Sequence, residues 1–178
     1  LNKKFEIIES VGVLHHMEDP YLGWKILNEI LYVGGLMMVG LYSSFARKHI
    51  RRFRSTIKKL NIEINNKNIK YLREKIFKSN NSDFKLISTS EDFYSLSNLR
   101  DLLFHEKEHT FTIPEIDDLL KKIGLNFCGF ENRNVLDLFT NVYNGENDRY
   151  NLKYWHEFEV MNPRIFASMY QFWCQKNL

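Results

Sequence analysis

Two apolar runs stand near the start of the chain, on either side of a segment with helical spacing. Residues 5–13 and 36–41 are almost continuously apolar, which is typical of strands buried on both faces. Asp19 and Pro20 are predicted to begin a helix as its N-cap and first residue. Gly34 and Gly35 are predicted to end that helix and turn the chain. Strand, helix and strand in this order predict a crossover unit of a parallel sheet.

The rest of the chain alternates helical patterns with one further strand. Residues 43–80 and 92–109 have apolar positions at helical spacing. Thr112 and Glu115 have the spacing of a capping box, Gly124 is predicted to close the following helix, and residues 125–130 to form a strand. Helices are predicted over 135–143 and 150–160. The aromatic ending, residues 166–173, suits a strand or a helix equally.

The composition narrows the class of protein. The 178 residues are 44% hydrophobic and 26% charged, enough for one soluble domain with a core. No apolar run approaches the roughly 20 residues that cross a bilayer, so no membrane partner is expected. Cys128 and Cys174 lack metal-type spacing, so we expect free thiols, a cytoplasmic location and no metal. Because Leu1 is not Met and no signal peptide follows it, we expect a truncated domain.

Short motifs spread along the chain carry a family resemblance. They are Gly12-Val13-Leu14-His15-His16, Gly40-Leu41-Tyr42-Ser43, Asp92-Phe93-Tyr94-Ser95-Leu96-Ser97, Arg100-Asp101-Leu102-Leu103-Phe104-His105, Glu108-His109 and Met169-Tyr170-Gln171-Phe172-Trp173. In this order they resemble class I S-adenosylmethionine-dependent methyltransferases, in particular bacterial methyltransferase domains fused to tetratricopeptide repeats.

The resemblance implies an α/β fold. The chain would be the C-terminal portion of a Rossmann-like methyltransferase three-layer sandwich, with helices inserted after the fifth strand. Residues 1–178 would form a single partial domain, with the inserted segment at about 43–110. The glycine-rich cofactor loop of the family would lie before Leu1.

The resemblance also implies a function, which is methyl transfer from S-adenosylmethionine to an unknown acceptor. Its implied catalytic residues are His15 and His16, because ligands gather at the carboxyl ends of strands in open α/β sheets. The implied cofactor-binding residues are Ser10, Val11 and Gly12. The implied substrate cleft comprises Tyr42, Ser43, Arg100, Asp101, His105, Glu108 and His109.

Other readings remain open. The chain could be a non-catalytic methyltransferase-like interaction module, since most of the family's cofactor site would lie before Leu1. The basic run from Arg47 to Lys59 would suit nucleic acid, although a solvated helix face is the usual meaning of such a run. His105-Glu106-Lys107-Glu108-His109 matches the H-E-x-x-H zinc pattern, but no third ligand is evident.

A partner is also expected for the first strand. An unpaired strand edge is a template for another chain. We therefore expect a homo-oligomer through the strand edge between Phe5 and Val13.

Overall fold

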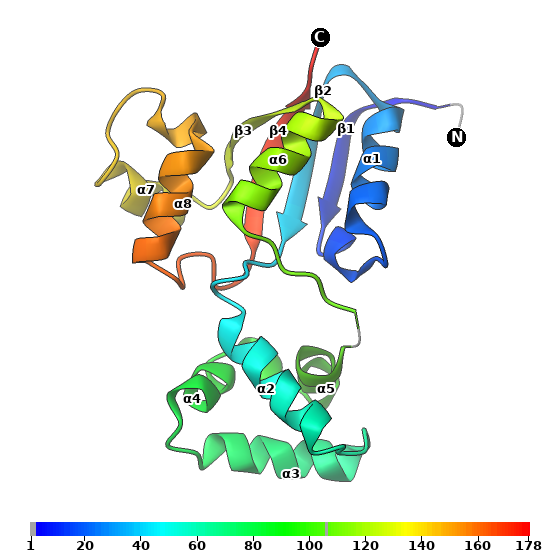
Figure 1. Cartoon of the computed structure of the whole chain (residues 1–178), viewed down its shortest axis with the longest axis vertical. Coiled ribbons are helices and arrows are strands. Elements are labelled where there is room, and N and C mark those ends of the chain that lie inside the picture. The colour runs from blue at the N-terminus through cyan, green and yellow to red at the C-terminus, as the bar shows by residue number, and fades with distance from the viewer. Residues whose placement is uncertain (1–2, 106) are drawn as a thin grey trace. The chain divides into compact units, whose positions relative to one another are not determined.

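The chain forms two compact units. The computed structural model describes residues 3–105 and 107–178. The sheet unit combines the residues up to Ala46 with those from Lys107 onward, and the helical unit begins at Arg47 and comprises the residues between. Figure 1 draws the helical unit in cyan to green. The expectation that both belong to a single domain stays a prediction.

The sheet unit contains a mixed four-stranded sheet. Its strands are β1 (Phe5–Val11), β2 (Leu31–Leu41), β3 (Leu125–Phe130) and β4 (Tyr170–Lys176), in the order β1-β2-β4-β3. β1 and β2 are parallel, whereas β4 is antiparallel to both of its neighbours. The predicted parallel unit is therefore confirmed, and of the aromatic ending, residues 170–173 lie in a strand.

Helix α1 (Pro20–Ile30) makes the crossover between the two parallel strands. The Asp19 carboxylate accepts a hydrogen bond from the Leu22 N–H at 3.0 Å, so the predicted N-cap is confirmed. The prediction that Gly34 and Gly35 end this helix is wrong, because β2 already begins at Leu31. The register steps from Leu31 opposite Phe5 to Leu36 opposite Ile7, so the two glycines lie in an irregularity of the strand. Gly34 has a φ of 76°, which a residue with a side chain rarely adopts.

The other helices of the sheet unit follow their sequence signals more closely. They are η1 (Leu14–His16), α6 (Ile113–Ile123), α7 (Arg133–Thr140), η3 (Asp148–Tyr150) and α8 (Leu152–Met161). α6 begins with the predicted capping box of Thr112 and Glu115 and ends at Gly124, whose left-handed φ is 72°.

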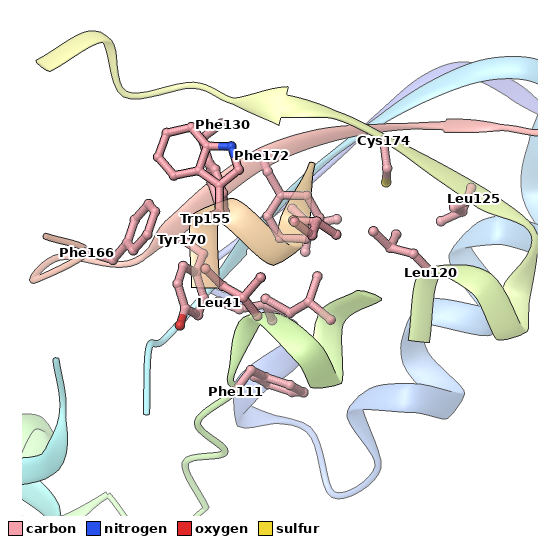
Figure 2. Close-up of a cluster of buried hydrophobic side chains, with 14 of the residues drawn as sticks. Leu41, Phe111, Leu120, Leu125, Phe130, Trp155, Phe166, Tyr170, Phe172 and Cys174 are labelled. Carbon is pink, nitrogen blue, oxygen red and sulfur yellow. The ribbon is translucent and has the colours of Figure 1, made fainter. Parts of the chain in front are cut away.

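The core of the sheet unit lies on one face of the sheet, which we call the covered face. Met37, Val39 and Phe172 point to it and are fully buried. Figure 2 shows Phe172 and Cys174 of β4 close to side chains of α6 and α8, such as Leu120 and Trp155. α1 and α7 contribute to the same cluster.

The opposite face, which we call the open face, is different. Ile7 points to it and is 59% exposed, and its neighbour Leu36 is also exposed. The expectation that the first strand is buried on both faces is therefore wrong. Of the layers in the expected sandwich, the described residues supply the sheet and one helical layer. Their α/β fold with inserted helices is confirmed.

The helical unit has a core of its own. Its elements are α2 (Lys48–Lys59), α3 (Asn66–Phe77), α4 (Ser82–Ser88), η2 (Glu91–Phe93) and α5 (Leu96–Phe104). Its buried residues include Phe53, Ile69, Ile87, Phe93 and Leu99. The prediction of one helix over 92–109 is wrong, because the Ser95 side chain caps a new helix and His105 is extended, with ψ at 122°.

Where the structure describes the chain, no helix combines the length and the apolar character needed to cross a bilayer.

Candidate functional site

Three aromatic rings meet at the carboxyl ends of β1 and β2. His15 and His16 lie in η1, just after β1, and Tyr42 directly follows β2. The His15 ring centroid lies 4.3 Å from that of His16 and 4.0 Å from that of Tyr42. Parallel strands end at the same edge of a sheet, so the fold itself brings these residues together. We call His15, His16 and Tyr42 the aromatic cluster.

An extended segment from the second half of the chain borders this cluster. The His109 N–H donates to the His15 carbonyl at 2.8 Å, and the Phe111 N–H donates to the Tyr42 carbonyl at 2.8 Å. The Ser44 N–H donates back to the Phe111 carbonyl, also at 2.8 Å. Residues 107–111 are thus fixed by backbone hydrogen bonds to the ends of both parallel strands.

The two histidines differ in what they can do. His15 is fully buried, with an exposed fraction of 0%, whereas His16 is half-buried. The His16 Nδ1 lies 3.2 Å from the Lys107 carbonyl oxygen. Because a carbonyl only accepts, this hydrogen bond places the proton on Nδ1 and makes Nε2 the basic nitrogen of the neutral ring.

A buried carboxyl group supports the segment after Tyr42. Glu159 of α8 has an exposed fraction of 0%. Its carboxyl oxygens accept from the Ser43 hydroxyl at 2.6 Å and from the Tyr170 hydroxyl at 2.7 Å. The Ser43 Oγ in turn accepts from the Phe45 and Ala46 N–H groups, both at 3.1 Å. The carboxyl group therefore fixes the backbone just beyond the end of β2.

Burial also changes the protonation of this group. Desolvation raises the pKa of Glu159, while the hydrogen bonds from Ser43 and Tyr170 act in the opposite direction. Burial likewise raises the pKa of the Tyr170 hydroxyl, and the neighbouring Glu159 adds to that shift. Tyr170 is therefore a neutral donor at any ordinary pH.

The expected cofactor residues lie at the end of β1 but face different ways. Ser10 is buried with the covered face, and Val11 is exposed on the open face. Gly12 has a φ of 76°, and its N–H points to the Gly40 carbonyl at 3.4 Å. A Cβ at Gly12 would meet nothing within 4 Å, so this glycine is required by its backbone angle rather than by a close neighbour.

The expected substrate cleft divides between the two units. Four of its residues belong to the sheet unit, namely Tyr42, Ser43, Glu108 and His109. Arg100, Asp101 and His105 belong to the helical unit. There Arg100 donates to the Asn66 side chain at 2.8 Å, and the Asp101 carbonyl accepts from Arg54 at 3.3 Å.

The zinc pattern lacks the geometry that it needs. α5 ends at Phe104, so His105 and His109 do not share one face of a helix. Glu106 lies outside the described residues. No group of three His, Cys, Asp or Glu residues that could hold a metal ion is found in residues 3–105 and 107–178.

Two hollows open on the sheet unit. One of about 370 Å³ is lined by His109, Thr110 and Phe111 together with Tyr21 of α1 and Glu115 of α6. A larger one, of about 680 Å³, is lined by Leu125, Asn126 and Phe127 and by residues around the start of α8. The register places the start of β3 beside the end of β4, opposite the amino half of β2, so the larger hollow lies away from the aromatic cluster.

The sequence did not identify Glu159 or the role of residues 107–111. Glu159 had a detectable signal, because it stands seven residues after Leu152 and four after Trp155, on the apolar face of α8. A carboxylate at such a position is expected to be buried with hydrogen-bonding partners. The segment 107–111 had no comparable signal, since the hydrogen bonds that join it to His15, Tyr42 and Ser44 at 2.8 Å are between backbone groups.

Comparisons with known proteins identify the fold. No family model matches the chain. An uncharacterized protein of Synechococcus sp. is 29% identical over 137 residues, which cover 73% of this chain and 33% of that protein. The structure of PKMT2 from Rickettsia typhi in complex with AdoHcy superposes with a TM-score of 0.68 and 17% identity, covering 100% of this chain and 37% of that one. A second structure of PKMT2 gives a TM-score of 0.69 and 15% identity over 97% of this chain and 36% of that one.

The chain therefore has an α/β fold like that of PKMT2 from Rickettsia typhi. It spans about a third of the length of the relatives that it matches.

Proposed function

We propose that this chain is part of an S-adenosylmethionine-dependent methyltransferase and that the aromatic cluster lines its active site. The acceptor of the methyl group is not specified by this proposal. The observation that carries it is the position of His15, His16 and Tyr42 at the carboxyl ends of two parallel strands, where ligands bind in open α/β sheets. The likeness of the fold to a protein solved with AdoHcy supports it.

Within this proposal the two histidines have separate roles. His16 is half-buried and has Nε2 as its basic nitrogen, so it is suited to accept a proton from an acceptor nucleophile. His15 is fully buried between His16 and Tyr42, so it is suited to hold both rings in place. The Glu159 carboxyl group would act through Ser43 on the backbone that carries Tyr42.

The residues present would form one wall of a cofactor site. Gly12 and Tyr42 lie at adjacent strand ends, and the space that a Cβ would occupy at Gly12 is open to 4 Å. The eight glycines of the chain do not form a glycine-rich loop of the G-x-G-x-x-G type. The proposal therefore includes further polypeptide that completes the site, in keeping with the fraction of its relatives that this chain spans. The cofactor would supply the electrophilic methyl group.

The experiment is a ligand-observed NMR titration of the chain with AdoHcy. One wall of a site is expected to bind AdoHcy weakly, with a dissociation constant near 1 mM, which corresponds to a binding free energy of roughly −4 kcal/mol. Tyr42→Ala is expected to weaken binding about tenfold by removing an aromatic contact. Tyr32→Ala is the matched control, because Tyr32 is exposed and lies near the start of β2, the strand that Tyr42 follows.

The outcomes separate two functions. Binding that depends on Tyr42 and not on Tyr32 supports the proposal. The absence of a binding signal at about 5 mM AdoHcy, five times that dissociation constant, would contradict it. It would favour the second candidate, an interaction module with a methyltransferase-like fold, for which the exposed apolar residues of the open face are the specific observation.

A nucleic-acid-binding function has less support. Arg54 of the basic run donates to the Leu102 carbonyl at 2.7 and 2.9 Å, and Arg52 forms an ion pair with Asp83 at 3.1 Å. Arg47 is buried. Several of these charges are therefore engaged inside the helical unit rather than displayed together.

A further inference from the structure

Positive charge is concentrated in the helical unit. Residues 47–106 contain 14 of the 25 Lys and Arg residues of the chain but only 7 of its 22 Asp and Glu residues. The unit therefore has a formal net charge of +7, whereas the rest of the chain, with 11 basic and 15 acidic residues, has −4. An excess of this size within one small unit gives it a positive potential that attracts anionic partners.

Much of the arginine charge is used inside the unit. Arg52, Arg54, Arg73 and Arg100 each donate to a side chain or a backbone carbonyl of another segment of the unit. These hydrogen bonds hold the helices together, so they leave less of the arginine charge for a partner.

The lysines of α3 are disposed differently. Lys67, Lys70, Lys75 and the C-cap Lys78 are exposed, and none of them forms a hydrogen bond or an ion pair with a residue in 3–105 or 107–178. The ammonium group of lysine is a compact, strongly hydrated charge on a flexible stem. It therefore suits attraction to a charged surface that offers no fixed pattern of acceptors.

These lysines share one face of α3. Residues 67, 70, 71, 74, 75 and 78 recur at three-to-four spacing, so they lie on the same side of the helix. The buried residues Ile69, Leu72 and Ile76 lie on the opposite side, in the core of the helical unit. In Figure 1, α3 runs along the lower border of this unit. Its outward side, which we call the basic face, carries four lysines, Tyr71 and a single acid, Glu74.

Exposed apolar side chains accompany these charges. Phe77, next to Lys78 in the chain, is 69% exposed, and Tyr71 is exposed on the basic face itself. Ile64, just before the N-cap of α3, and Leu60, the C-cap of α2, are exposed as well. Lysines next to large apolar side chains are typical of surfaces that bind at a membrane interface. There the ammonium groups meet the lipid phosphates, and the apolar groups reach the acyl boundary.

The same features fit nucleic acid less well. Base stacking needs an open aromatic face, but the Lys75 ammonium lies over the Tyr71 ring, 5.3 Å from its centroid. Bidentate contacts to bases and phosphates are made by arginine, and four arginines of the unit are engaged within it. Aliphatic side chains such as Leu60 and Ile64 gain more from acyl chains than from bases.

We propose that the basic face of α3 binds the surface of membranes that contain anionic phospholipids. Its lysines lie at the level of the lipid phosphates, and Phe77 reaches the acyl boundary. Such binding needs no segment that crosses the bilayer. The proposal therefore replaces the expectation of no membrane partner, which followed from the lack of such a segment. It is independent of cofactor binding, because it uses only residues of the helical unit.

The test is co-sedimentation of the chain with phosphatidylcholine vesicles that contain or lack phosphatidylserine. Wild-type chain is expected to bind only the vesicles with phosphatidylserine and to be released as the salt concentration is raised. Lys67→Gln combined with Lys70→Gln should lower the partition coefficient about ten- to thirty-fold, since each charge near the surface contributes roughly fivefold. Lys122→Gln combined with Lys153→Gln is the matched control. It removes the same charge from exposed positions of the sheet unit and should lower binding less than about threefold.

A second variant tests the apolar contribution. Phe77→Ala should weaken binding about five- to tenfold, whereas Leu138→Ala, at an exposed position of α7, should not. Thermal unfolding of all variants establishes that they fold. Equal binding to both kinds of vesicle, or binding to neither at low salt, would overturn the proposal. Equal losses in the two lysine pairs would show that net charge acts rather than the basic face. Tighter binding to single-stranded RNA than to the anionic vesicles, lost with Lys67 and Lys70, would reassign the face to nucleic acid.

Discussion

The two faces of the sheet are built from the same strands but differ in how far their side chains are buried. On β4, Phe172 points to the covered face, where its ring lies against Trp24 of α1 and Phe127 and Phe130 of β3. Its neighbour Trp173 points to the open face and donates to the Glu131 carboxylate at 2.8 Å. On β2, Met37 is fully buried and its neighbour Leu36 is exposed. Apolar residues on both faces therefore do not guarantee burial on both. What a face buries depends on the elements that the rest of the chain can lay over it.

The largest expected effect of this difference is on stability. Phe172→Ala should lower the free energy of unfolding by about 3–5 kcal/mol, because it leaves a cavity in a closely packed core. Trp173→Ala, one residue along the same strand, should lower it by about 1 kcal/mol, since the side chain is only partly covered and loses one hydrogen bond. Urea denaturation followed by circular dichroism measures both. Equal losses would show that the open face is covered in solution.

A smaller effect is expected from the polar network under the covered face. Glu159→Ala leaves the Ser43 and Tyr170 hydroxyl groups without their buried acceptor. The expected loss is about 1–3 kcal/mol in the free energy of unfolding. Glu157→Ala, at an exposed position of the same helix, is the control and should stay within about 0.5 kcal/mol of wild type.

The contribution of the Glu159 network to the free energy of unfolding is expected to change with pH. Burial raises the pKa of Glu159, so the folded protein holds this proton more tightly than the unfolded chain does. Its contribution to the free energy of unfolding is most favourable below the unfolded pKa and falls as pH rises through the higher folded pKa. Glu159→Gln should remove this fall, which appears as a difference between the two pH profiles. Parallel profiles would show that Glu159 ionises as it does in the unfolded chain.

The smallest expected effect is on the reactivity of the two cysteine thiols rather than on the free energy of unfolding. Burial raises the pKa of the Cys174 thiol on the covered face. Burial also raises the pKa of the Cys128 thiol at the bulge of β3. Cys174 is fully buried and Cys128 half-buried. A thiol reagent should therefore label Cys128 in the native protein and reach Cys174 only on unfolding. Mass spectrometry of the labelled chain distinguishes the two, and native labelling of Cys174 would contradict the packing of β4.

The sequence predicted the elements whose signals are local. Asp19, Thr112 with Glu115, and Gly124 fixed helix ends by side-chain hydrogen bonds or backbone angle, and the structure confirms them. The start of β2 was missed because Gly34 and Gly35 look like a turn, although pairing with β1 keeps Leu31 in the strand. Tertiary pairing outweighed the local signal there.

The candidate site was predictable only in part. His15, His16 and Tyr42 were expected at strand ends, and the parallel pairing brings their rings together. Arg100, Asp101 and His105 were assigned to the cleft by resemblance; they belong to the helical unit, and their place in the cleft stays a prediction. The sequence could not anticipate residues 107–111 beside the cluster, because the hydrogen bonds from the His109 and Phe111 N–H groups join backbone atoms and carry no residue preference.

The most direct test of the proposed active site is an amide NMR map of the chain during titration with AdoHcy. The account predicts that shifts concentrate in residues 10–16 and 42–44, at the carboxyl ends of β1 and β2. It predicts no comparable shifts at Leu125, Asn126 and Phe127 or at Leu152 and Lys153, which line the larger hollow. Shifts centred on that hollow, or none at all, would contradict the assignment of the aromatic cluster as the site.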